Sequence, residues 1–238
     1  MSNTRALRAP PTNRLFAALT KDEYQRLLPA LTPCPLVFGE VIYESGDRIR
    51  NVYFPTSGII SLLATVEDRG TLEVGIVGRE GMVGLPAFMG VQTSGNRAVV
   101  QGAGEAMRMK ATAFRNACEN GGSFPRLLRR YTHSRLTQIA QGAVCNRFHP
   151  IDARLARWLL MTRDRMGTDE FQLTQEFLSN MLGVRREGVS KAAGELQQQH
   201  LISYSRGNLL ILNRAGLHAL ACHCYEVIKA EYDTFLPK

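Results

Sequence analysis

The chain has 238 residues, of which 45% are hydrophobic and 21% charged, as in a soluble globular protein of one or two domains. It has no run of about 18 apolar residues, which excludes a membrane-spanning helix from the expected elements. The N-terminus lacks the apolar stretch of a secretory signal, and the five cysteines are an odd number. These features predict a cytoplasmic protein with reduced thiols.

The net charge of +8 is unevenly distributed along the chain. From Phe124 onward there are 16 Lys and Arg against 10 Asp and Glu, whereas the preceding part has 13 against 11. A basic C-terminal half is compatible with nucleic-acid binding. It is equally compatible with a basic surface that only maintains solubility.

The first 110 residues begin with a short helix and continue as strands. Thr20 and Glu23 have the spacing of a capping box, which predicts a short helix that becomes irregular near Pro29. From Val37 to Lys110, short β-rich runs alternate with turn signals, which predicts a compact antiparallel sandwich or barrel. The predicted strands are 40–44, 51–54, 59–66, 72–77, 97–101 and 105–110.

After the break at Gly121-Gly122, residues from Phe124 to about Asn146 are predicted to form one long helix. A narrow stripe at steps of three and four favours a coiled-coil seam between two copies of the chain. The alternative is a surface helix packed on its own domain. The stripe consists of Leu128, Thr132, Leu136, Ile139 and Ala143.

The C-terminal part is predicted to be a winged helix-turn-helix. A helix from Pro150 to about Met166 precedes two helices within Thr174–Gln199. A hairpin of 201–204 and 209–212 follows, and then a last helix from Arg214 to about Tyr232.

The turn between the paired helices carries a specific pattern. Counted from Gln175, Gly183 is ninth, where a left-handed residue is needed, and Ser179 is fifth, where the helices cross. An ordinary helical hairpin in a core would match only part of this pattern. The positions expected to be buried between the helices are Leu178, Leu182, Val184, Val189 and Ala192.

Cysteines in the last predicted helix raise the question of a metal site. His218 and Cys222 are four residues apart, so both could reach one ion from a single helix face. Cys224, however, belongs to the apolar stripe of that helix and is expected to be buried. We therefore predict no metal site, although the sequence leaves a metal or redox role for His218, Cys222 and Cys224 open.

The order of a small β-domain, a long helix and a winged helix-turn-helix resembles the Crp/Fnr family of bacterial transcription regulators. The sharpest match is Arg186-Glu187-Gly188-Val189-Ser190-Lys191, which is similar to the family's Arg-Glu-x-Val-(Ser/Thr)-Arg. The resemblance implies an α+β fold with a β-roll or jelly-roll sensor domain at 1–123. It further implies a dimerisation helix at 124–148 and a winged helix-turn-helix DNA-binding domain at 149–238.

The resemblance also implies roles for residues of the second paired helix. Arg186 would bind guanine O6 and N7, Glu187 would accept a hydrogen bond from a cytosine amino group, and Ser190 would contact a phosphate. Lys191 replaces the family's Arg and cannot form the same bidentate fork, so looser base discrimination is expected there.

Two further arginines are candidate DNA contacts. Arg185 stands where the family often has a capping Ser, so the helix is expected to begin with unpaired N–H groups that a phosphate could satisfy. For Arg206 at the tip of the predicted wing, the sequence leaves two alternatives open. It contacts the DNA backbone or minor groove, or it is a solvated turn residue.

The ligand region of the sensor departs from the family pattern. Cyclic-nucleotide-binding members have Gly-Glu-(Leu/Ile) and Arg-(Ser/Thr)-Ala, but here the matching stretches are Gly84-Leu85-Pro86 and Asn96-Arg97-Ala98. The carboxylate is lost and Arg97 is displaced by one residue, which on a strand turns it to the other face. We therefore expect no binding of cAMP in the family manner. An iron–sulfur cluster is also not expected, because Cys34 is the only cysteine in the first hundred residues.

The sequence as a whole predicts a homodimeric transcription regulator that binds double-stranded DNA, and it leaves the effector unidentified. RNA polymerase is an expected partner, and no membrane contact is expected. The rival interpretation is a small-molecule-binding signalling module whose helix pair serves protein contacts. No Gly-rich phosphate loop, metal-binding His-x-x-x-His or nucleophile elbow occurs, so an enzyme is not expected.

Overall fold

The computed structural model describes residues 12–66 and 70–237. It begins with helix α1 (Arg14–Ala17), helix α2 (Lys21–Leu27) and a 3-10 turn at Leu28–Ala30. The predicted capping box is present at the start of α2: Thr20 Oγ1 accepts from the backbone N–H of Glu23, and the Glu23 carboxylate accepts from the N–H of Thr20. The helix ends where Pro29 enters the 3-10 turn, as expected.

Two antiparallel sheets follow and form the predicted sandwich. One sheet has the order β1-β7-β3 and the other β2-β6-β4-β5. Strand β1, which contains Pro33 and Pro35, is absent from the predicted elements. The two prolines are tolerated because β1 is an edge strand, where a residue without an N–H donor loses no hydrogen bond to a neighbouring strand. The strands are β1 (Leu31–Leu36), β2 (Val41–Tyr43), β3 (Asn51–Pro55), β4 (Ile59–Val66), β5 (Gly70–Val77), β6 (Arg97–Gly102) and β7 (Gly104–Lys110).

Helix α3 (Ala111–Glu119), which is not among the predicted elements, leads into the long helix α4 (Ser123–Phe148). A carboxylate from the N-terminal region caps α4: Glu23 Oε1 accepts from the N–H of Ser123 at 2.6 Å. Hydrogen bonds from the side chain and the backbone of Ser123 lower the pKa of Glu23 to about 2. A single Glu therefore caps both α2 and α4 and fixes the start of the long helix.

The C-terminal part contains helices around a small sheet of order β8-β10-β9. One prediction for this part is wrong: the last helix is two helices, because Ala221 is extended (ψ 141°). Periodicity cannot reveal this break, since the apolar spacing continues across it. The elements are α5 (Ile151–Met166), β8 (Glu170–Gln172), α6 (Gln175–Leu182), α7 (Arg186–Gln198), β9 (Ile202–Ser205), β10 (Asn208–Ile211), α8 (Arg214–Leu220) and α9 (Cys224–Asp233).

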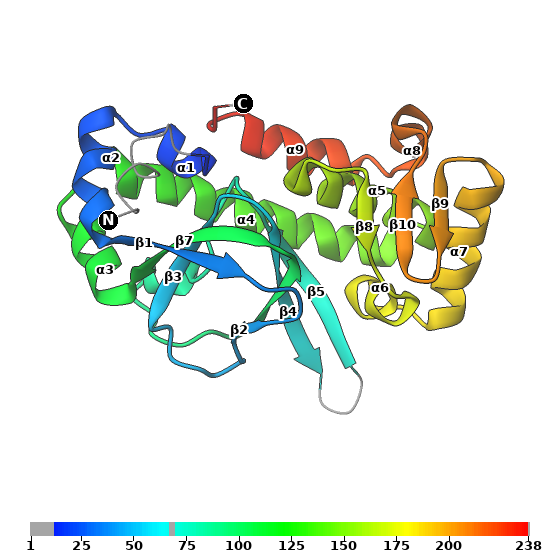
Figure 1. Cartoon of the computed structure of the whole chain (residues 1–238), viewed down its shortest axis with the longest axis horizontal. Coiled ribbons are helices and arrows are strands. Elements are labelled where there is room, and N and C mark those ends of the chain that lie inside the picture. Colours follow the sequence, from blue (N-terminus) through cyan, green and yellow to red (C-terminus); the bar gives the residue numbers. More distant parts are fainter. Residues whose placement is uncertain (1–11, 67–69, 238) are drawn as a thin grey trace.

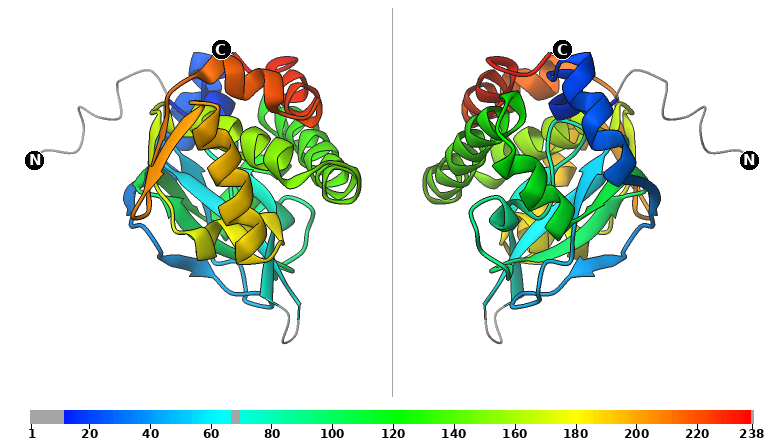
Figure 2. Two further views of the ribbon diagram at one scale, coloured as in Figure 1. Left: turned by 90° about the vertical axis from the view of Figure 1, so that its right-hand side faces the viewer. Right: turned by 90° about the vertical axis from the view of Figure 1, so that its left-hand side faces the viewer.

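Helix α4 runs along the molecule behind the sandwich, and α6, α7 and the β9–β10 hairpin lie together at the end opposite α2 and α3 (Figure 1). Viewed from the ends, α9 lies beside α4 (Figure 2), and the two helices are in contact. Among the described residues, none of the helices combines the length and the apolar character that crossing a bilayer requires.

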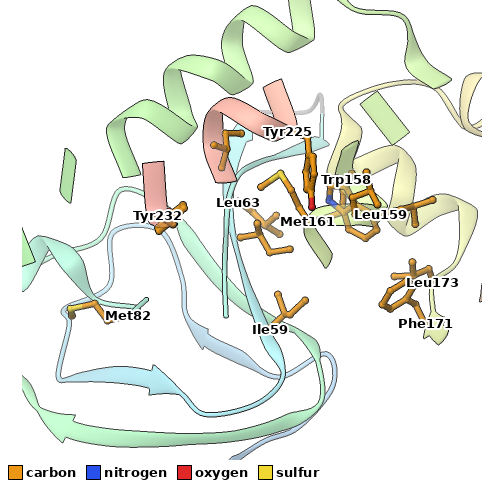
Figure 3. Close-up of a cluster of buried hydrophobic side chains, with 14 of the residues drawn as sticks. Ile59, Leu63, Met82, Trp158, Leu159, Met161, Phe171, Leu173, Tyr225 and Tyr232 are labelled. Carbon is orange, nitrogen blue, oxygen red and sulfur yellow. The ribbon is translucent and has the colours of Figure 1, made fainter. Parts of the chain in front are cut away.

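The hydrophobic core is continuous from the sandwich to the C-terminal helices. Ile59 and Leu63 of β4 and Trp158 and Leu159 of α5 belong to one buried cluster (Figure 3). This continuity predicts that the sandwich and the C-terminal helices unfold cooperatively.

Two polar contacts bridge the same boundary. Trp158 Nε1 donates to Glu73 Oε1 at 3.0 Å, and Arg165 Nε lies 2.7 Å from Glu80 Oε1. Burial raises the pKa of Glu73, while hydrogen bonds from Ser61 and Trp158 oppose that shift. The sensor sheet and α5 are thus held by hydrogen bonds as well as by apolar packing.

Candidate nucleic-acid interface

The turn between α6 and α7 has the predicted geometry. Thr174 Oγ1 caps α6 by accepting from the N–H of Phe177, and Gly183 ends the helix in the left-handed region with φ 61°. A Cβ added at Gly183 would lie 2.6 Å from Leu72 Cδ1 of β5. A side chain at this position would therefore be strained by the backbone and would also press on the sensor sheet.

The back of the helix pair is buried as predicted. Leu178 and Val189 are fully buried, Leu182 and Ala192 are almost so, and Val184 is half-buried. Helix α7 packs against α5 as well as α6. This packing orients α7 so that its opposite face is directed to solvent.

The exposed face of α7 carries every candidate DNA contact that the sequence placed on this helix. The exposed residues are Arg185, Arg186, Glu187, Ser190 and Lys191. No protein group in the described part of the chain buries this basic, hydrogen-bonding surface. The surface lies on a single α-helix, and the DNA major groove is wide enough to admit an α-helix.

Gln175, at the start of α6, is a residue that sequence reasoning missed. Its Oε1 accepts from Arg186 Nε at 3.4 Å and lies 2.9 Å from Ser190 Oγ. The Ser190 hydroxyl also lies 3.1 Å from the carbonyl oxygen of Arg186. Gln175 therefore holds two of the candidate contacts in one orientation. The only signal in the sequence is its position as the first residue of the motif.

Helix α7 begins without a side-chain cap, as predicted. Arg185 is its N-cap residue, with an extended backbone and no capping hydrogen bond from its side chain. The first N–H groups of α7, with Arg185 as the N-cap residue before them, lie at the positive end of the helix dipole. Such an end suits an anion such as a phosphate.

The wing is a tight hairpin between β9 and β10. Arg206 and Gly207 form its two-residue loop with φ 49° and φ 82°, the positive values that a type I′ turn requires. Tyr204 Oη donates to the carbonyl oxygen of Leu173 at 2.7 Å and holds the wing against the start of the helix pair. Arg206 is exposed at the tip, where both predicted alternatives for it stay open.

The two stretches expected to form the ligand region, 84–86 and 96–98, are attached to different sheets of the sandwich. Gly84 has φ 96° and follows Val83, which forms a bridge to Tyr53 of β3, while Leu85 begins a 3-10 turn. Arg97 and the preceding Asn96 stand at the start of β6, in the other sheet. Arg97 Nε lies 3.2 Å from Glu44 Oε2, so its charge already has a partner.

The stripe predicted as a dimer seam on α4 divides into two parts. Leu128 is fully buried in the core of the chain, so its assignment to the seam is wrong. Thr132 is half-buried and donates its hydroxyl to the carbonyl oxygen of Leu128 at 2.8 Å. Leu136 and Ile139, in contrast, are 61% and 43% exposed, and Ala143 is also exposed. Of the predicted stripe, Leu128 thus belongs to the core of the chain, while Leu136, Ile139 and Ala143 are exposed to solvent.

The cysteines of the C-terminal region are not arranged as one helix would place them. His218 lies on α8 and its imidazole contacts the Glu226 carboxylate. Cys222 and Cys224 lie at the junction of α8 and α9 and face Cys145 and His149 at the end of α4. The possibility that His218 and Cys222 share one helix face, which the sequence left open, does not hold, because the helix breaks between them.

Comparison with known proteins agrees with this architecture. The family model of the cyclic nucleotide-binding domain matches residues 36–120, and that of the Crp-like helix-turn-helix domain matches residues 153–220. The chain belongs to the Crp/Fnr family of transcription regulators. Both domains of a Crp/Fnr regulator are therefore present, and the predicted α+β fold is confirmed.

Solved Crp/Fnr structures share this fold at low sequence identity. A putative Crp/Fnr regulator from Eubacterium rectale is 18% identical, with a TM-score of 0.68 over 87% of this chain and 96% of that one. FixK2 from Bradyrhizobium japonicum is 18% identical, with a TM-score of 0.69 over 81% and 98%. The c-di-GMP responsive regulator CLP from Xanthomonas campestris is 17% identical, with a TM-score of 0.66 over 81% and 99%. No curated protein matches the chain.

Proposed function

We propose that this regulator binds an inverted-repeat operator as a homodimer and reads it with α7. The observation that carries the proposal is that one face of α7 is buried and the opposite face is exposed. Val189, Ala192 and Leu196 are buried while Arg185, Arg186, Glu187, Ser190 and Lys191 are all exposed. A helix fixed by its back and basic on its front is suited to the major groove.

The proposed contacts differ in what they contribute. Arg186 donates to guanine O6 and N7, and Glu187 accepts from cytosine N4, so these two residues specify sequence. Arg185, Ser190 and the N-terminus of α7 bind phosphates and set the position of the helix. Lys191 adds charge with looser base preference, and Arg206 contacts the backbone or minor groove beside the site.

The dimer is proposed to form along the C-terminal half of α4. Of the nine large hydrophobic side chains that are exposed in the described part of the chain, four lie there: Leu136, Ile139, Val144 and Phe148. Leu136 and Ile139, three residues apart, share one face of α4, and exposed apolar side chains that share a face support an interaction surface there. A second copy related by a two-fold axis would cover it with the same residues and present two α7 helices.

Selection of duplexes from a random DNA pool by the full chain tests this proposal. We expect an inverted repeat whose half-site centres are about 10–10.5 base pairs apart, because two α7 helices must enter successive major grooves. The double variant Leu136→Glu/Ile139→Glu should sediment as a monomer and lose at least about tenfold in affinity, since two partners no longer bind together. Lys229→Glu on the exposed side of α9 is the matched control. Recovery of single, unrepeated sites, or a dimer unaffected by the double variant, would contradict the proposal.

The effector is proposed not to be cAMP bound in the family manner. The position of the ribose-binding carboxylate is occupied by Leu85 and Pro86, and Arg97 is paired with Glu44. Calorimetry of the full chain with cAMP should show no saturable heat at micromolar concentrations. Saturable binding that is micromolar or tighter, and that Arg97→Ala abolishes, would refute this statement. An iron–sulfur cluster is likewise not proposed.

The remaining parts of the proposal follow from regulation of transcription. The chain acts in the cytoplasm, where bacterial DNA is found, and contacts RNA polymerase beside the operator. No catalytic step is proposed. The rival function, protein contacts through the helix pair, predicts that the random pool yields no enriched sequence.

A further inference from the structure

Four metal-ligand side chains from two distant parts of the sequence meet at the end of α4. They are Cys145 and His149 from the last turn of α4 and its C-cap, and Cys222 and Cys224 from the α8–α9 junction. Their ligand atoms, three Sγ and one imidazole nitrogen, all lie within 4.8 Å of one another. None of the three thiols forms a disulfide.

Two contacts within this Cys3His cluster are close to the edges of a tetrahedral site. Cys145 Sγ lies 3.5 Å from Cys222 Sγ, and Cys224 Sγ lies 3.4 Å from His149 Nδ1. With Zn–S bonds of about 2.3 Å and Zn–N bonds of about 2.0–2.1 Å, a tetrahedron has S···S edges of about 3.8 Å and S···N edges of about 3.6 Å. These two contacts are within a few tenths of an ångström of such edges, and since the remaining ligand atoms lie within 4.8 Å of one another, shifts of up to about 1 Å would close the tetrahedron.

The surroundings suit a bound ion. Cys145 and Cys224 are almost fully buried and Cys222 is 9% exposed, so the site is shielded, while His149 is half-buried and leaves a path for entry. Gln141 Nε2 donates to Cys224 Sγ at 3.2 Å, the kind of outer hydrogen bond that orients a thiolate ligand. Arg154 and Arg157 both have a buried Nε without a hydrogen-bond partner, and their charges lie near the thiols. They would offset the net negative charge of three thiolates around a divalent ion.

We propose that Cys145, His149, Cys222 and Cys224 bind one thiophilic divalent metal ion, Zn²⁺ in the first place. Each of the three thiols loses its proton to solvent on binding, and His149 binds through a neutral imidazole nitrogen. The oxidation states of the metal and of the ligands do not change. Four protein ligands close the coordination sphere, so the ion is structural or regulatory and does not activate a water molecule.

The position of the site indicates what the ion would do. His149 and Pro150 are the extended residues between α4 and α5, where the chain leaves the long helix for the DNA-binding part. Binding would fix this link to the start of α9, which packs along α4. The ion would therefore hold the C-terminal helices in one orientation relative to α4.

Metal titration of the anaerobically purified, chelator-treated full chain tests the proposal. We expect one Zn²⁺ per chain by elemental analysis, and with Co²⁺ the intense visible absorption of a tetrahedral thiolate complex. Cys224→Ser should lose this absorption and bind Zn²⁺ more than about 100-fold less tightly, because a ligand is lost. Gln141→Leu removes only the outer hydrogen bond and should weaken binding about 10–100-fold. Cys118→Ser, a half-buried thiol outside the cluster, is the matched control and should bind like the unmodified chain.

Circular dichroism of the metal-free proteins shows whether each variant is folded before titration. If Cys224→Ser does not fold, the predicted weakening of metal binding by Gln141→Leu still tests the proposal, because Gln141 is not a ligand. The proposal is overturned if the unmodified chain binds less than about half an equivalent of either metal. It is also overturned if Cys118→Ser loses as much affinity as Cys224→Ser. Formation of a Cys145–Cys222 disulfide in air, with no metal binding under reduction, would overturn it in favour of a redox pair. None of these results depends on DNA binding, so they leave the proposed operator recognition untouched.

Discussion

Replacement of Arg165 by methionine is expected to lower the free energy of unfolding by about 3–5 kcal/mol, because it breaks a buried ion pair. Arg165 Nε lies 2.7 Å from Glu80 Oε1, and both side chains are less than a tenth exposed. Arg165 also donates to the carbonyl oxygen of Met161 at 3.0 Å. The substitution leaves the buried Glu80 carboxylate without its ion-pair partner, at the boundary between the β-sandwich and α5.

Urea unfolding followed by the fluorescence of Trp158, the single tryptophan, measures this loss at one fixed protein concentration. Arg163→Met is the control, two residues earlier on the same helix. Arg163 Nε is also 2.7 Å from a carboxylate, that of Asp169, but these side chains are 29% and 47% exposed. The control should therefore cost less than about 1 kcal/mol.

The double variant Glu80→Gln/Arg165→Met should be more stable than the sum of the single losses predicts, because the two charges are removed together. Equal costs for Arg165→Met and Arg163→Met would show that burial does not distinguish the two ion pairs. In that case the contact between Glu80 and Arg165 does not hold the sensor to the C-terminal helices.

Replacement of Arg186 by alanine is expected to weaken binding to the selected operator by about 1–3 kcal/mol, a loss of roughly 5- to 150-fold. The physical reason is the loss of two parallel hydrogen bonds to one guanine. Preference at that base pair should relax, while preference at the other positions stays. Affinity for random DNA should change much less, because phosphate contacts dominate nonspecific binding.

The neighbouring variant Arg185→Ala distinguishes the loss of a positive charge from the loss of base-specific hydrogen bonds. It removes the same charge one residue earlier, at the N-cap of α7, where a phosphate contact is proposed. It should weaken specific and random DNA to a similar degree and lower the salt slope by about one. If Arg186→Ala behaves in the same way, Arg186 does not read a base. Fluorescence anisotropy with labelled duplexes at several salt concentrations measures both variants.

Much of the architecture is predictable because it is encoded locally. The alternating strands of the sandwich, the capping box at Thr20 and the glycine turn at Gly183 each depend on residues within a short window. The exposed face of α7 follows from the 3.6-residue period once its buried face is known. Local signals of this kind also carry the family resemblance.

The errors come from contacts between distant residues. Strand β1, with Pro33 and Pro35, is missing from the predicted elements, and it is an edge strand that pairs only with β7. Leu128 has the spacing of the dimer stripe, yet it is fully buried in the core of the chain. Periodicity identifies an apolar face without saying what covers it.

The cysteine cluster shows the same limitation. Cys145 and Cys222 are 77 residues apart, so their spacing carries no metal-site signature. The sequence suggests only that Cys222 and His218, four residues apart, could share a helix face. The break at Ala221 separates those two and directs Cys222 toward α4. Only the packing of the α8–α9 junction on α4 brings the four ligands together.

The central claim is that α7 reads a specific DNA sequence as part of a dimer. Its most direct test is the affinity of the full chain for the selected inverted repeat, compared with a scrambled duplex of the same length and composition at physiological salt. We predict at least about a thousandfold preference for the inverted repeat, which is the lower end for sequence-specific regulators. Equal affinity for the two duplexes would contradict the claim.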